Sequence, residues 1–196
     1  MPDSMRVTNL FLKLRHGERL ESVDQIHYGQ DGLHQNVACA PFRQALIASR
    51  SVIAECGLQV GDLRENIVVD CDDLYDLPSG TIIEIGTARI RLTFHCEPCK
   101  QILRLIKFDQ IEHRRGVFGS FLNSGTISVG DELVVTEERM ESIPYATKER
   151  LRWYLQHNDA PSAALDLIHK IGLPAKYAKI MPRMLKRGEA RVSQEN

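Results

Sequence analysis

From Thr81 to Phe94 the chain runs TIIEIGTARIRLTF, and this stretch decides the fold class. Its first half is rich in β-favouring residues, and in its second half apolar residues alternate with Arg and Thr. Alternation of this kind is typical of a strand with one buried face. Gly86-Thr87 supplies a tight connection between the two halves. The stretch therefore predicts two antiparallel strands, over 81–85 and 88–94.

Further short strands are predicted on both sides of this hairpin. Residues 5–14 and 66–70 are apolar and β-rich, and residues 125–135 predict two short strands around a Gly130-Asp131 turn. Several short strands with glycine-rich corners favour a mainly β, barrel-like sheet over a parallel α/β fold.

Helices are expected around and after the strands. Arg43–Cys56 has a broad apolar face at helical spacing, and Gly57 is a natural stop. After residue 142 three helices are predicted, over 145–157, 161–171 and 174–186. The sequence thus predicts a barrel-like domain over 1–142 and a small three-helix appendage over 143–196.

Composition limits the possible classes of protein. The chain has 196 residues, 43% of them hydrophobic, and no run approaches the roughly 20 apolar residues of a membrane span. The first residues lack the apolar core of a signal peptide, and the five cysteines are an odd number. We therefore expect no membrane partner, reduced thiols and a cytoplasmic location.

Charge is distributed unevenly along the chain. Residues 1–143 carry 15 Lys+Arg and 21 Asp+Glu, a net charge of −6, whereas residues 144–196 carry 10 and 5, a net charge of +5. A basic tail is compatible with nucleic-acid binding. No aromatic interleaving or base-reading motif accompanies it, which favours a solvated helical face against the acidic body.

The predicted hairpin runs directly into His95-Cys96-Glu97-Pro98-Cys99. Lys100–Ile106 follow with helical apolar spacing, and Pro98 suits a first helical position. Cys99 would then lie in a first helical turn, which favours a thiolate, the form that ligates metals and attacks electrophiles. One Cys-x-x-Cys pair cannot close a zinc site without other ligands, and Cys96 suits a small buried residue. Cys99 is therefore the candidate functional thiol.

Other candidate ligands lie outside this segment. Arg64 and Asn66 precede the predicted strand 67–69 and offer a charged fork and an amide to an anionic or heterocyclic ligand. His34 and Arg43 are further candidate anion ligands, although a solvent-facing Arg, a turn Asn and a hydrogen-bonded His are the simpler alternatives. The acidic loop 70–76 lacks the glycine and final Glu of a calcium-binding loop, which indicates a structural role.

The order of these motifs resembles the MOSC domain family, named for the carboxy-terminal part of molybdenum cofactor sulfurases, over about residues 5–138. The motifs that carry the resemblance are, in chain order, GxxGLH at 29–34, RQALI at 43–47, GDLRENI at 61–67, DLYDLPSG at 73–80, EIG at 84–86, PC at 98–99, RGVFG at 115–119 and GTISVGD at 125–131. The resemblance implies a barrel-like domain that binds the molybdenum cofactor, a molybdopterin, through Cys99 as metal ligand and catalytic thiol. It also implies that Arg64 and Asn66 hold the pterin phosphate region.

Two activities follow from the resemblance. Relatives of the amidoxime-reducing enzymes reduce small N-hydroxylated compounds to amines. This chain has no iron–sulfur ligand spacing, so a separate protein would have to donate electrons. The alternative is a sulfur-carrier module that holds a persulfide on Cys99. Glu97 departs from relatives that have a small hydroxyl residue there, and Phe118 stands where some reductases have Tyr.

Overall fold

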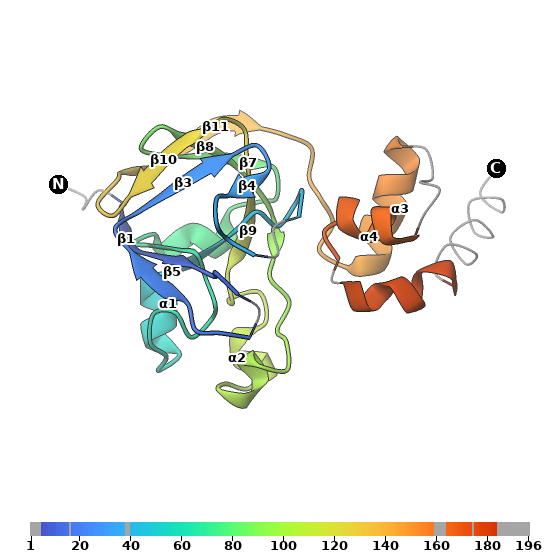
Figure 1. The fold of residues 1–196 in the computed structure, drawn as a ribbon, viewed down its shortest axis with the longest axis horizontal. Coiled ribbons are helices and arrows are strands. Elements are labelled where there is room, and N and C mark those ends of the chain that lie inside the picture. The colour runs from blue at the N-terminus through green and yellow to red at the C-terminus, as the bar shows by residue number, and fades with distance from the viewer. Residues whose placement is uncertain (1–4, 16, 38–39, 159–163, 174, 184–196) are drawn as a thin grey trace.

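A computed structural model describes residues 5–15, 17–37, 40–158, 164–173 and 175–183 (Figure 1). Its strands and helices are β1 (Val7–Leu12), β2 (Glu21–Val23), β3 (Gln25–Gly29), β4 (Gly32–Leu33), β5 (Ala45–Ser49), α1 (Arg50–Glu55), β6 (Ile67–Val69), the 3₁₀ helix η1 (Asp72–Asp76), β7 (Thr81–Ile85), β8 (Ala88–His95), the 3₁₀ helix η2 (Ile102–Arg104), α2 (Phe108–Ile111), β9 (Val117–Phe121), β10 (Gly125–Ser128), β11 (Leu133–Arg139), α3 (Thr147–His157), α4 (Ala164–Lys170) and the 3₁₀ helix η3 (Ala175–Lys179).

Eight strands form one curled sheet in the order β11-β7-β8-β9-β5-β6-β1-β2, with β10, β3 and β4 in a second sheet. The larger sheet curls back on itself. Arg6 and Glu132 form an isolated antiparallel β-bridge through their backbones, and the Val7 amide donates to the Asp131 carbonyl at 2.9 Å. These contacts join the start of β1 to the start of β11. The predicted fold class, a mainly β, barrel-like domain with peripheral helices, is confirmed.

The predicted hairpin over 81–85 and 88–94 is present as β7 and β8. β7 and β8 pair antiparallel from Ile82 opposite Arg91 to Ile85 opposite Ala88. The apolar positions of β8 are buried and its arginines are half-buried, as the alternation predicts. Ala88, Ile90 and Leu92 fill the interior of the barrel together with Leu10, Ile47 and Ile67, whereas Phe94 packs in a separate cluster with Phe118.

The helix predicted over 43–56 is wrong in its first half. Ala45–Ser49 form β5, and only Arg50–Glu55 form a helix, which Gly57 ends with a φ of +67°. β5 lies between β9 and a parallel neighbour, β6, and all five of its residues are buried. A strand covered on both faces is continuously apolar, so periodicity cannot distinguish it from a buried helix.

Two other local predictions are also corrected. The helix expected over 100–106 is a turn followed by the three-residue η2. The strands at 125–128 and 133–139 flank the expected turn, where the Ser128 amide donates to Asp131 Oδ2 at 2.8 Å. They do not pair with each other, however, because β10 pairs with β3 and β11 pairs with β7.

Helices α3, α4 and η3 form a small cluster beside the barrel (Figure 1). Leu151, Leu167 and Ile171 are buried in its own apolar core. Trp153 also packs against barrel residues and lies at 5.8 Å from the Phe42 ring, edge to face. The last part of the predicted helix, 184–186, lies outside the described residues, and the domain boundary at 142 stays a prediction. Within the described ranges, no helix is long and apolar enough to cross a membrane.

Candidate functional site

Cys99 lies in the loop that leaves β8. The Cys96 amide, nearby, donates to the Gly116 carbonyl at 2.8 Å, which joins this loop to the residues that lead into β9. Cys96 is buried, with burial raising the pKa of its thiol, and Cys99 is half-buried against an apolar cluster that includes Leu63 and Ile102. Cys56, Cys71, Cys96 and Cys99, the four described cysteines, form no disulfide with one another. The buried position of Cys96 is confirmed.

The helix expected to favour a Cys99 thiolate is too short to do so. The Leu103 amide donates to the Cys99 carbonyl at 3.0 Å, which closes a single turn that runs into η2. A macrodipole requires several aligned peptide units. Any stabilisation of the thiolate must therefore come from neighbouring charges.

Three cations from different parts of the chain supply those charges. Lys13 follows β1, Arg64 precedes β6 and Arg115 precedes β9. The pKa of Lys13 is lowered, first by burial and then by the charges of Arg64 and Arg115, while Cys99 acts on it in the opposite direction. These effects place Arg64, Arg115 and Cys99 each within electrostatic reach of Lys13.

Arg115 is the most deeply placed of these cations, with 8% of its surface exposed. Its Nη1 donates to the Glu97 carbonyl at 2.6 Å and its Nη2 to the Leu63 carbonyl at 3.5 Å. Its Nε is buried and has no hydrogen-bond partner among the described residues. A buried donor without a partner is costly, and a bound anion would satisfy it. This is a second, geometric sign of an anion site.

Arg64 and Asn66 lie on either side of buried Glu65 and have different surroundings. Arg64 is half-buried, its Nη2 donates to the Glu18 carbonyl at 3.0 Å, and its backbone has a φ of +63°. Asn66 is buried, and its Nδ2 donates to the Phe11 carbonyl and to Asn36 Oδ1, both at 3.1 Å. Asn66 Oδ1 accepts from the Leu46 amide at 3.1 Å. Its amide therefore ties β1, β5 and β6 together around Lys13.

His34 and Arg43 do not join this cluster. His34 is exposed beyond β4, where its amide donates to the His27 carbonyl at 2.9 Å. Arg43 lies against the helical cluster: its Nη1 donates to the Gly172 carbonyl at 3.1 Å, and its guanidinium stacks over the Phe118 ring at 4.3 Å. Of the five predicted site residues, Cys99 and Arg64 both lie within electrostatic reach of Lys13, and the Asn66 side chain bonds to Phe11, Asn36 and Leu46 instead.

Sequence reasoning missed Lys13 as a site residue and placed Arg115 only within a motif. Each stands at a strand end, and the barrel closure that gathers strand ends is not visible in a local pattern. Lys13 lies near the end of the predicted strand 5–14, whereas no strand was predicted after Arg115, so position gave a signal for Lys13 alone.

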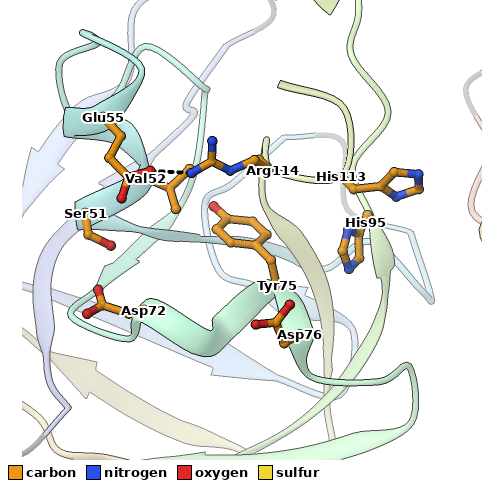
Figure 2. A pocket seen from close by; sticks show the side chains of 9 residues that line it. All are labelled: Ser51, Val52, Glu55, Asp72, Tyr75, Asp76, His95, His113 and Arg114. Atoms are coloured by element: carbon orange, nitrogen blue, oxygen red, sulfur yellow. Dashed lines mark hydrogen bonds and ion pairs between the residues drawn. The ribbon is translucent and has the colours of Figure 1, made fainter. Parts of the chain in front are cut away.

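A separate cavity of about 350 Å³ lies between α1, η1 and the end of β8 (Figure 2). It is lined by Ser51, Val52, Glu55, Asp72, Tyr75, Asp76, His95, His113 and Arg114. None of the predicted site residues lines it. Arg114 pairs with Glu55 there, and the Tyr75 hydroxyl accepts from the Ser49 amide at 3.2 Å. Within the described ranges, no group of three or more His, Cys, Asp or Glu side chains is arranged to hold a metal ion.

The sequence profile of the MOSC domain matches residues 34–134. The chain belongs to the MOSC domain family. No curated protein sequence matches this MOSC chain.

Solved structures confirm the MOSC fold. The YuaD protein of Bacillus subtilis superposes with a TM-score of 0.61 at 16% identity, over 70% of this chain and 97% of its own. YiiM of Geobacillus stearothermophilus has a TM-score of 0.54 at 15% identity, over 92% and 99%. YiiM of Escherichia coli has a TM-score of 0.51 at 19% identity, over 93% and 94%. The two YiiM alignments extend through the helical cluster as well as the barrel, and at these identities they establish the fold alone.

Proposed function

We propose that this MOSC protein binds the molybdenum cofactor at Cys99. The observation that carries the proposal is that Arg64, Arg115 and the half-buried Cys99 thiol all lie within electrostatic reach of Lys13. Cys99 packs against apolar residues that include Leu63, Arg115 donates to the Leu63 carbonyl, and one buried Arg115 donor has no partner among the described residues. The cofactor is a phosphate-bearing pterin, so its negative charge suits this cluster, and a soft thiolate suits molybdenum. The residues present therefore fit the group.

The side chains would divide the work of binding. Cys99 would be the single protein ligand of the metal, because no described cluster offers more. Arg64 and Arg115 would hold the anionic end of the pterin, and Lys13 would keep Cys99 deprotonated by its charge. Asn66, whose two amide hydrogens already bond within the protein, would act by holding Lys13 and β6 in place.

The reaction that we propose is the reduction of a small N-hydroxylated compound to the amine, in which two electrons and two protons break the N–O bond and the oxygen leaves as water. When bound, the molybdenum centre would supply the redox chemistry. The protein would place the substrate beside Cys99, and a separate donor protein would supply electrons. The four free thiols support a reducing compartment, and with it a cytoplasmic location.

An anaerobic assay with an N-hydroxylamine substrate and a chemically reduced viologen dye tests this activity. Protein from a host that makes the cofactor should form amine, and protein from a host unable to make it should not. Cys99→Ser should lose the activity, and Cys96→Ser should retain most of it. Amine formation by the cofactor-free protein would contradict the proposal.

A sulfur-carrier function is the second candidate, favoured by the partial exposure of Cys99 beside cations that stabilise a persulfide anion. It predicts a mass increase of about 32 Da, one sulfur atom, on the Cys99 peptide, reversed by a thiol reductant. A persulfide on Cys99 together with no molybdenum would favour this function over the reductase.

A further inference from the structure

Glu97 carries a carboxylate and lies next to Arg115, one of the three cations described above. It precedes Cys99 by two residues, and its own carbonyl is held by Arg115 at 2.6 Å. Both Glu97 and Cys99 act electrostatically on the buried Cys96 thiol, raising its pKa. An unpaired carboxylate here would oppose the binding of an anion and compete for Arg115.

Arg150 of α3 meets this carboxylate from the helical cluster. Its side chain is fully buried, its Nη2 donates to Glu97 Oε1 at 3.2 Å, and its Nε donates to the Pro144 carbonyl at 2.9 Å. The guanidinium also lies over the Phe94 ring at 3.4 Å. These contacts hold the guanidinium in place, so it cannot easily leave Glu97 to bind another group.

We infer that Arg150 is a positioning residue of the Cys99 site: by pairing with Glu97 it cancels the charge of this carboxylate and leaves Arg115 free to act on an anion. The helical cluster is then part of the site, because it contributes the charge that makes Glu97 compatible with an anionic ligand. The inference rests on the proposed function only for the identity of that anion. The positive potential at Cys99 can be measured without any cofactor.

Alkylation of Cys99 by iodoacetate and by iodoacetamide measures this potential. The two reagents attack the same thiolate, but only iodoacetate is charged, so the ratio of their rates reports local charge and cancels thiolate fraction and access. The rates would be measured on cofactor-free full-length protein at one pH and low salt, by mass spectrometry of the Cys99 peptide. The Cys56 peptide of the same digest is an internal control, since Cys56 lies beside Arg114 and Glu55 instead.

Arg150→Met should lower the iodoacetate-to-iodoacetamide ratio at Cys99 about three- to tenfold, because one neutralising charge is lost. Adding Glu97→Gln to this variant should restore the ratio to within about twofold, which a loss of packing alone would not do. Arg152→Met, which removes an exposed cation from the same helix, should leave the ratio unchanged. The Cys56 ratio should not change in any variant.

An unchanged ratio in Arg150→Met, or a lowered ratio that Glu97→Gln does not restore, would overturn the inference. If Arg150→Met does not fold, Glu97→Gln in the otherwise natural chain should raise the ratio by a similar factor, and no rise would overturn it. Molybdenum content, measured separately, reports on the proposed function. The predicted ratios in a protein that never acquires molybdenum would leave the charge compensation standing and reject the cofactor.

Discussion

Arg64 occupies a backbone conformation that favours glycine. Its φ of +63° lies in the left-handed region, where a side chain with a Cβ is strained by about 1 kcal/mol. Strain of this kind persists where the residue contributes something that glycine cannot. Here the Arg64 guanidinium donates to the Glu18 carbonyl and lies within electrostatic reach of Lys13.

Replacing Arg64 with glycine should therefore separate stability from binding. Arg64→Gly should leave the free energy of unfolding unchanged or raise it by up to about 1 kcal/mol, as the backbone strain is relieved. The same variant should retain much less molybdenum after purification. Urea unfolding and metal analysis measure the two effects, and a loss of more than about 1 kcal/mol would assign Arg64 a structural role instead.

His95 predicts how stability depends on pH. Burial lowers its pKa, as does the nearby charge of His113, while a hydrogen bond to the His113 backbone and the charge of Asp76 oppose the shift. Because the folded-state pKa lies below the unfolded value of about 6.5, His95 contributes stability above that pH. This stability is lost as the pH falls through the folded-state pKa.

His95→Gln removes this titration. Between pH 7.5 and pH 5 the melting temperature of the natural protein should fall about 2–4 °C more than that of the variant. Thermal unfolding followed by circular dichroism across that range measures the difference. Parallel pH profiles would show that the imidazole does not titrate differently in the folded and unfolded protein.

At the scale of elements, β8 was predictable because its apolar residues alternate with half-buried arginines, and β6 and β7 were predictable because they are rich in β-favouring residues although they are almost entirely buried. β5 was mistaken for a helix because both of its faces are covered, which only the tertiary structure determines. The short η2 shows the opposite error, in which apolar spacing at 102, 105 and 106 suggested a helix that the chain does not continue.

The loop before β9 contains Gly116, whose carbonyl accepts a hydrogen bond from the Cys96 amide. Gly116 has a φ of +143°, and a Cβ there would lie 2.7 Å from Leu46 Cδ1 and 2.9 Å from the Ile47 carbonyl oxygen. Gly116→Ala should lower the free energy of unfolding by about 2–4 kcal/mol, through backbone strain and overpacking together.

Gly57→Ala is the matched control for this prediction. Gly57 also has a positive φ, of +67°, but a Cβ there would meet no atom within 4 Å. Its substitution by alanine should lower the free energy of unfolding only through backbone strain, by about 1 kcal/mol. Equal losses of stability in urea unfolding would contradict the packing around Gly116.

At the scale of the whole molecule, the helical cluster and the barrel share one interface. Glu97 and Phe118, the two departures from the family pattern, both lie there: Glu97 pairs with Arg150, and Phe118 packs beneath Arg43 and against Phe94. The sequence predicted the helices and Cys99, but treated the helices as an appendage. Contacts between residues 53 positions apart, such as that of Glu97 with Arg150, leave no local pattern from which they could be predicted.

The same limit applies to the site. Arg64 and Asn66 were predictable because they stand together before one strand, whereas Lys13 and Arg115 reach the site only when the sheet curls and brings distant strand ends together. Closure of the sheet into a barrel also places His34 and Arg43 apart from the other candidate residues.

Molybdenum analysis of matched cysteine variants tests the central claim most directly. Protein purified from a cofactor-producing host should contain molybdenum and pterin in about equal amounts. Cys99→Ser should lose most of the metal, because we propose its half-buried thiol as the ligand, and Cys96→Ser should keep it. Equal retention of molybdenum in the two variants, or its absence from the natural protein, would contradict the assignment of Cys99 as the cofactor ligand.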